Sequence, residues 1–303
     1  MSALFSLFLE NIFPIIAVAG VGYLLQRIFN LDPRPISIAI FYSLTPALIF
    51  QLTVRNTVNG ADSLRIVGLV ISLIIVLCLF SYGITRILKL SPLATAGFLL
   101  SAAFMNAGNY GLSLNNYALG SAGLVWASLF FITHVVMNSS LGVFIASSGK
   151  MKLTDALRGL VRVPALYTFT IALIIRLSNY SFPAPLMKPI DLLASATIPA
   201  MLLVLGMQLG RAGVPKNIGR VGLATAIRLI LSPLVAWILT LFLGLPKVAA
   251  QAGILEAAMP SPVLAIIISL EYDTEPEFVS SVVLLSTLLS PFTLTPLLAI
   301  LGL

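Results

Sequence analysis

The sequence predicts an all-α polytopic membrane protein with about ten transmembrane helices. Hydrophobic residues make up 59% of the 303 positions, charged residues only 9%, and the mean hydropathy is +1.08. Soluble domains carry about 25% charged residues, so this composition does not suit a water-facing surface. The net charge of +7 is then expected in the loops of a chain embedded in a lipid bilayer, and it predicts no nucleic-acid partner.

Apolar runs of roughly 17–25 residues are long enough to cross a bilayer as helices. The sequence contains such runs along its whole length. We expect spans near residues 3–27, 35–54, 65–88, 93–115, 121–147, 161–180, 188–210, 217–243, 248–270 and 277–301. These runs leave little chain for a soluble domain.

The distribution of Lys and Arg predicts the orientation, because cytoplasmic loops are enriched in both. With the N-terminus outside, eleven of these residues fall in cytoplasmic loops and five in outer loops. This bias favours a multi-pass protein of the plasma or inner membrane with both termini outside. It also places the polar segment 148–160 on the cytoplasmic side.

Short sequence matches recur at a nearly constant offset of 153 to 155 residues. Pro46-Ala47 matches Pro199-Ala200, and Ala102-Ala103 matches Ala257-Ala258. The matches predict two halves of five spans each, residues 1–147 and 161–303, joined by the cytoplasmic loop 148–160. An odd number of spans inverts the second half, and inverted repeats are common in transporters.

The stretch FMNAGNYGLSLNN at residues 104–116 does not fit the apolar run around it. Gly108 and Gly111 lower the cost of breaking a helix, while Asn106 and Asn109 offer amide donors and acceptors. A broken helix exposes N–H groups that favour anions. The stretch therefore predicts one wall of a substrate site. In the alternative interpretation, Gly permits close helix packing and Asn bridges neighbouring helices.

The repeat offset predicts a matching break in the ninth span. The sequence there is EAAMPSPVLAI, and Pro260 and Pro262 each remove a backbone donor in mid-span. Interrupted segments at matching places in two halves indicate a transporter site. We therefore expect Met259, Pro260, Ser261 and Pro262 to form the second wall.

Two charges are expected at membrane depth, Glu256 in the ninth span and Arg228 in the eighth. They could form an ion pair. Alternatively, Arg228 could face an anionic substrate while Glu256 carries a coupling proton or binds Na⁺. In a purely structural interpretation, Arg228 extends to the inner interface and Glu256 is a structural partner for neighbouring groups.

His134 and Asn138 are four residues apart and share a helix face in the fifth span. His134 could relay protons, although a satisfied buried histidine is the favoured interpretation. Asn138 is the stronger candidate for the substrate site. With a single His and a single Cys in the chain, we expect no metal site and no cofactor other than Na⁺ or H⁺ as a coupling ion.

These patterns favour a secondary transporter of a small organic anion, most simply a carboxylate. A membrane-embedded ligand sensor or an ion channel that uses the same broken helices is the alternative. The sequence has no GxxxxGK[ST], HExxH or GxSxG motif, so neither an ATP-driven pump nor an intramembrane enzyme is expected.

Several segments resemble the auxin efflux carrier family. GNYGLSLNNYALGSAGLVWASLF is similar to its fourth and fifth helices, and AAMPSPVLAIII is similar to its ninth. The resemblance covers nearly the whole chain. In this comparison Asn109 matches the Asn of the Gly-Asn-x-Gly stretch, and Pro260 matches the Met-Pro stretch.

The resemblance implies two inverted five-helix repeats whose broken helices, the fourth and the ninth, cross at the binding site. It also implies elevator-type alternating access, small organic anions as substrates, and a homodimer. Ser113 and Leu264 depart from the family, where many members have Pro and Asn. The loss of an Asn at Leu264 affects the expected ligand contacts.

Overall fold

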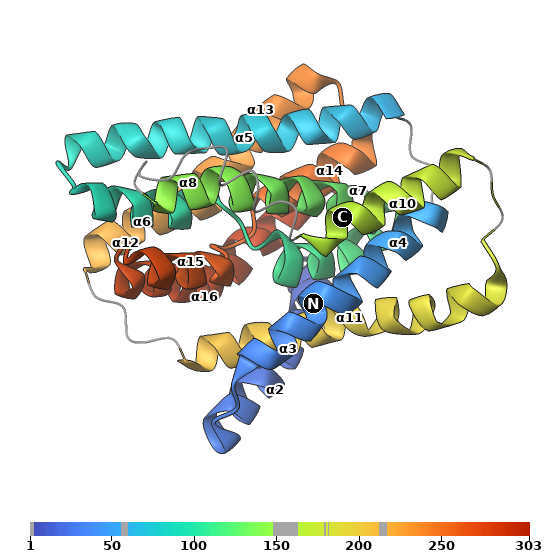
Figure 1. The fold of residues 1–303 in the computed structure, drawn as a ribbon. Helices are drawn as coiled ribbons and strands as arrows, with labels where there is room; N and C mark the ends of the chain where they lie inside the picture. Colours follow the sequence, from blue (N-terminus) through green and yellow to red (C-terminus); the bar gives the residue numbers. More distant parts are fainter. Residues whose placement is uncertain (1–2, 56–59, 148–162, 179, 181, 212–216) are drawn as a thin grey trace.

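A computed structural model describes residues 3–55, 60–147, 163–178, 180, 182–211 and 217–303 of the chain. Within these residues every regular element is a helix (Figure 1). Seven helical stretches of this part are long and apolar enough to cross a bilayer. The chain is thus an all-α polytopic membrane protein, as predicted. The predicted connecting loop 148–160 lies outside the described residues.

The first half of the chain forms its helices in the order of the predicted spans; η marks a π-helical turn. They are α1–η1–α2 (Ala3–Leu7, Phe8–Ile12, Phe13–Phe29), α3–η2–α4 (Pro33–Ala39, Ile40–Leu44, Thr45–Arg55), α5 (Gly60–Ile87), α6 (Pro92–Ala103) and η3–α7–η4–α8 (Ala107–Leu112, Ser113–Met137, Asn138–Gly142, Val143–Ala146). Gly120, with φ +63°, turns the chain between the predicted fourth and fifth spans. This left-handed conformation favours glycine.

The second half continues in the same manner. Its helices are α10 (Pro164–Leu177), α11 (Ala184–Arg211), α12–η6–α13 (Ile218–Ala226, Ile227–Leu231, Ser232–Leu243), α14 (Lys247–Ala257), α15 (Val263–Tyr272) and α16 (Pro276–Leu301). All ten predicted ranges are helical over most of their length. Because α10 and α15 are short and the stretch 92–146 holds two predicted spans, the count of ten and the inverted repeat remain predictions.

Both predicted helix breaks are present, but one has a different cause than expected. The first break comprises Phe104–Asn106, and Gly108 and Gly111 lie in the π-helical turn that follows it. The prediction that these glycines break the helix is therefore wrong. A Cβ at Gly108 would press on the ring of Phe131, so this glycine permits close packing, as the alternative interpretation proposed. The second break, 258–262, includes Pro260 and Pro262 as predicted.

The helices form two groups that each draw on both halves of the chain (Figure 1). One group contains α2, α3, α4, α10 and α11, in which α2 packs along α11 and α4 contacts α10 and α11. The other contains α5, α6, α7 and α12 to α16, in which α14 packs against α7 and α13. The breaks lie in the second group.

Glycines allow the backbones of α2 and α11 to approach closely. A Cβ at Gly206 would collide with the backbone oxygen of Ala19, and one at Gly22 would collide with that of Leu203. Small residues serve this purpose between membrane helices, where association depends on packing. The contact between α2 and α11 therefore depends on glycine at both positions.

We expect Gly206→Ala to destabilise the protein by about 1–3 kcal/mol, as overpacking typically does, because the added methyl must push α2 away from α11. Gly222→Ala, in α12, is the matched control, since a Cβ there meets nothing within 4 Å. Thermal unfolding of the two variants in detergent measures the difference. Equal unfolding temperatures would contradict the close-packing interpretation.

Candidate functional site

The two helix breaks touch each other through their backbones. Asn106 N donates to Pro260 O at 2.8 Å, and Ser261 Oγ donates to Ser101 O at 2.6 Å. Each break thus satisfies polar groups that the other leaves unpaired, as backbone at membrane depth requires. The contact joins the two sequence stretches that were predicted to form opposite walls of one site.

Neighbouring helices satisfy two more backbone groups of this crossover, by which we mean residues 104–106 and 258–262. Ser261 N donates to Ser286 Oγ of α16 at 3.1 Å, and Met105 N donates to His134 Nε2 at 3.2 Å. Because Nε2 accepts a hydrogen bond, the ring proton of His134 belongs on Nδ1. This is the satisfied buried histidine that the sequence favoured over a proton relay.

Arg228 holds the C-terminal ends of both half-helices that lead into the breaks. Its guanidinium donates to Ala102 O at 3.3 Å, in α6, and to Ala257 O at 2.6 Å, in α14. It also donates to Ser232 Oγ, which itself donates to Ala257 O at 2.7 Å. Helix C-termini carry partial negative charge, so the guanidinium both pairs and neutralises these carbonyls.

Two interpretations of Arg228 from the sequence are therefore wrong. No ion pair within the described residues joins it to Glu256. Nor does it extend to the interface, because it is fully buried. Its Nη groups are occupied by backbone carbonyls and Ser232, which leaves them poorly placed for a substrate.

Glu256 lies against η3 and contacts Asn115, which belongs to the predicted stretch 104–116 but was not among the individual residues predicted for the site. Asn115 Nδ2 donates to Glu256 Oε1 at 3.2 Å and to Gly111 O at 3.0 Å. Gly111 has no room for a side chain, because a Cβ there would collide with the Glu256 carboxylate. The four-residue spacing of Gly111 and Asn115 was the available sequence signal, since it places both on one helix face.

The remaining predicted amides differ in exposure. Asn106 Nδ2 and both polar side-chain atoms of Asn138 are buried with no hydrogen-bond partner among the described residues. Asn109 is partly exposed. It belongs to the first turn of η3, in which the backbone N–H groups have no acceptor within the helix. Asn109 is thus the predicted amide best placed to meet a molecule from outside.

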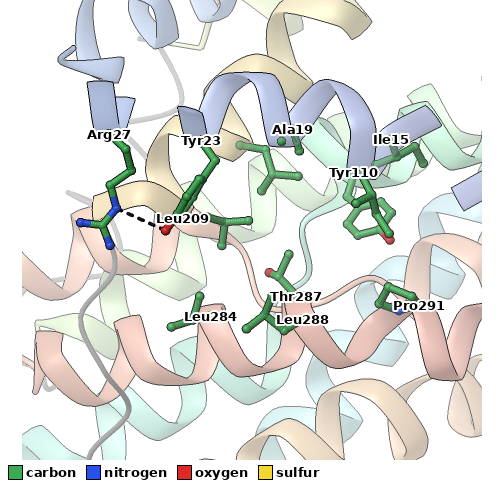
Figure 2. A pocket seen from close by; sticks show the side chains of 13 residues that line it. Ile15, Ala19, Tyr23, Arg27, Tyr110, Leu209, Leu284, Thr287, Leu288 and Pro291 are labelled. Carbon is green, nitrogen blue, oxygen red and sulfur yellow. Dashed lines mark hydrogen bonds between the residues drawn. The ribbon is translucent and has the colours of Figure 1, made fainter. Parts of the chain in front are cut away.

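A cavity of about 540 Å³ lies beside this region and is lined by α2, α11 and α16 (Figure 2). From the predicted stretch 104–116 only Tyr110 reaches it. Tyr110 was not itself a predicted site residue, and none of the predicted site residues lines the cavity. At the opposite end Arg27 Nε donates to Tyr23 Oη at 3.3 Å, and its guanidinium lies 5.5 Å from the ring centroid of Tyr23.

The cavity therefore runs from Tyr110, in η3, towards the exposed side chain of Arg27, which forms a cationic mouth. Its walls are largely apolar, and Tyr110 and Thr287 add hydroxyl groups. Tyr110 Oη also accepts a hydrogen bond from Ser290 Oγ at 3.3 Å. Among the described residues no group of three or more His, Cys, Asp or Glu side chains could hold a metal ion.

We expect Arg228→Leu to lower the yield of folded protein strongly. The change leaves Ala102 O and Ala257 O buried without their charged donor, and each hydrogen bond to a charged group contributes about 1.5–3 kcal/mol. Arg228→Lys keeps the charge with fewer donors and should recover part of the yield. Size-exclusion profiles after detergent extraction measure both variants. Wild-type yield for Arg228→Leu would refute this role.

The comparisons with known proteins agree with this architecture. The family described as "Membrane transport protein" matches residues 7–157 and 151–298. An "Uncharacterized transporter" of Methanothermobacter thermautotrophicus is 26% identical over 93% of this chain and 94% of its own. A "Putative malonate transporter" of Rhizobium meliloti is 26% identical over 95% of this chain and 93% of its own.

A third relative links the chain to plants. "Auxin efflux carrier component 1" of Arabidopsis thaliana is 29% identical over 144 residues, which are 45% of this chain and 23% of that protein. The expected resemblance is thereby confirmed over both halves of the chain by the family match. The chain belongs to the membrane transport protein family that includes the auxin efflux carriers.

Proposed function

We propose that the protein is a secondary transporter that carries a small carboxylate anion across the cell membrane. The observation that carries this proposal is the pair of broken helices joined by the hydrogen bond from Asn106 N to Pro260 O. Crossing breaks present half-helix ends at membrane depth, where transporters bind charged substrates. The "Putative malonate transporter" among the relatives supports a carboxylate as the substrate class.

The charge arrangement at the crossover favours an anion. Arg228 neutralises the C-terminal, negative ends of α6 and α14. The N-terminal, positive ends of η3 and α15, which begin at Ala107 and Val263, have no such acidic cap in the described structure. Free N–H groups at helix N-termini are effective anion sites, so we assign the carboxylate to the N-terminal turn of η3, next to Asn109.

We assign the cavity of Figure 2 as the route from this site to one membrane face, because Tyr110, the residue after Asn109 in η3, lines it. It lies between α2 and α11 of one helix group and α16 of the other. Movement of the second group against the first would open or close this route. This arrangement supports elevator-type alternating access, with the first group, α2, α3, α4, α10 and α11, as the static one.

The experiment that tests the function is uptake of radiolabelled malonate into proteoliposomes that contain the purified protein. We expect saturable uptake that unlabelled carboxylates inhibit. Thermal-shift measurements with malonate, malate and succinate provide an independent measure of binding. Absence of both uptake and stabilisation for every carboxylate would contradict the proposed substrate class.

We expect Asn109→Ala to weaken malonate binding about 10- to 100-fold. The amide would donate to a charged carboxylate, and such bonds contribute about 1.5–3 kcal/mol. Asn116→Ala is the matched control, since it removes an amide seven residues along the same segment. Thermal-shift titration yields both dissociation constants. Equal constants for the two variants would exclude Asn109 from the site.

We expect Arg27→Gln to raise the KM for malonate several-fold and to leave the maximal rate nearly unchanged. A cationic mouth raises the local concentration of anions, and salt screens this effect. Arg34→Gln removes an exposed arginine outside the cavity and serves as the control. Uptake kinetics at low and high ionic strength test this role, which fails if Arg27→Gln matches Arg34→Gln at low salt.

A further inference from the structure

We propose that Glu256 is a neutral carboxylic acid that forms a closed hydrogen-bonded pair with Asn115, and that it exchanges its proton once per transport cycle. The protonation of Glu256 follows from the geometry alone. Its part in coupling rests on the proposed transport function.

The donors and acceptors of this pair are unbalanced without a proton. Glu256 and Asn115 are both 0% exposed. The two amide hydrogens of Asn115 are used, because Nδ2 donates to Glu256 Oε1 and to Gly111 O. Glu256 Oε2 and Asn115 Oδ1 are both buried and without a hydrogen-bond partner in the described part of the chain. Both orphaned atoms are acceptors, so neither can satisfy the other.

A single proton on Oε2 removes the imbalance. The protonated Oε2 becomes a donor. Its acceptor would be Asn115 Oδ1, which is unpaired and belongs to the same amide group that donates to Glu256 Oε1. A carboxylic acid and a primary amide form such a closed pair with two hydrogen bonds. Both orphaned oxygens are then satisfied, as buried polar groups in native proteins are.

Among the described residues, no Lys, Arg or His side chain forms an ion pair with Glu256 that would stabilise a charged carboxylate. The elements packed against α14 are α5, α7, α13, α16 and η3. Their titratable or charged side chains, with those of α14 itself, are Asp62, Arg65, Cys78, Tyr82, Arg86, Tyr110, Tyr117, His134, Lys247 and Glu277.

Among these groups and Arg228, only Tyr110, His134 and Arg228 are buried. His134 and Tyr110 accept hydrogen bonds from Met105 N and Ser290 Oγ. Arg228 donates to backbone carbonyls and to Ser232. An isolated buried carboxylate is costly, so the neutral acid is the stable form.

The position of Glu256 links its proton to the anion. The carboxyl group lies against Gly111, within η3, whose N-terminal N–H groups we assign to the substrate. A neutral Glu256 leaves that positive end free for an anion, whereas a charged Glu256 repels one. Proton and anion therefore bind together. On release the proton passes from Oε2 to water, and the carboxylate left behind disfavours rebinding, as a proton–anion symporter requires.

Infrared spectroscopy of the purified full chain at pH 7 tests the protonation without any substrate. We expect the C=O band of a protonated carboxyl group, which exposed carboxylates do not show at this pH. The band should vanish in Glu256→Gln and persist in Glu271→Gln, which removes an exposed carboxyl. Gln can form the same closed pair with Asn115, so the variant is expected to fold. Absence of the band in the wild type would overturn the proposal without use of any variant.

Malonate uptake into proteoliposomes, with the membrane potential clamped, tests the coupling. One proton per malonate predicts that each unit of pH gradient changes the accumulation ratio about tenfold. Glu256→Gln should retain malonate exchange and lose this response, while Glu271→Gln keeps it. A full response in Glu256→Gln, or a wild-type response to Na⁺ alone, would overturn the coupling. A protonated band without malonate transport would contradict the proposed function and leave the assignment of the proton supported.

Discussion

The structure depends on one constraint, that backbone which leaves a helix inside a bilayer must still pair its N–H and C=O groups. The two breaks meet this constraint largely by pairing with each other, through Asn106 N and Pro260 O and through Ser261 Oγ and Ser101 O. Ser286 and His134 complete the pairing from α16 and α7. Because the hydrocarbon core of a bilayer offers no water as a hydrogen-bond partner, each break depends on the other for this pairing. The crossover therefore requires both halves of the chain.

The same geometry sets the electrostatics of the crossover. Each break separates the negative end of one half-helix from the positive end of the next. Arg228 is buried next to the C-terminal ends of α6 and α14 and donates to Ala102 O and Ala257 O. Its positive charge therefore stabilises these two helix ends. The positive ends, which are the N-termini of η3 and α15, have no acidic residue in their first turns. The nearby Glu256 accepts a hydrogen bond from the neutral amide of Asn115, and we propose that it is itself uncharged. This asymmetry is the basis on which we propose an anion site at the crossover.

Much of the architecture and part of the site could be predicted because they depend on patterns along the chain. Apolar runs identified the helices, and the offset of about 155 residues placed a second break at Pro260, near the position at which α14 ends. The cause of the first break was not predictable. Gly108 and Gly111 looked like its origin, yet they serve close contacts with Phe131 and Glu256 across the fold. A glycine can either weaken a helix or allow a side chain from another helix to approach its backbone closely. Only the residue packed against the glycine in the tertiary structure distinguishes these two roles.

The sequence by itself determined that the chain is a membrane protein, where its helices lie, and that two of its spans are interrupted. These features depend on hydropathy and on Gly or Pro content, which act locally along the chain. The tertiary structure alone decided the partners of the buried charges. Arg228 and Glu256 looked like a potential ion pair, yet one meets carbonyls from two half-helices and the other meets Asn115. It also decided that a cavity with Arg27 at its mouth adjoins Tyr110. Such partners lie up to 141 residues apart, and their proximity is set by packing of whole helices rather than by any local preference.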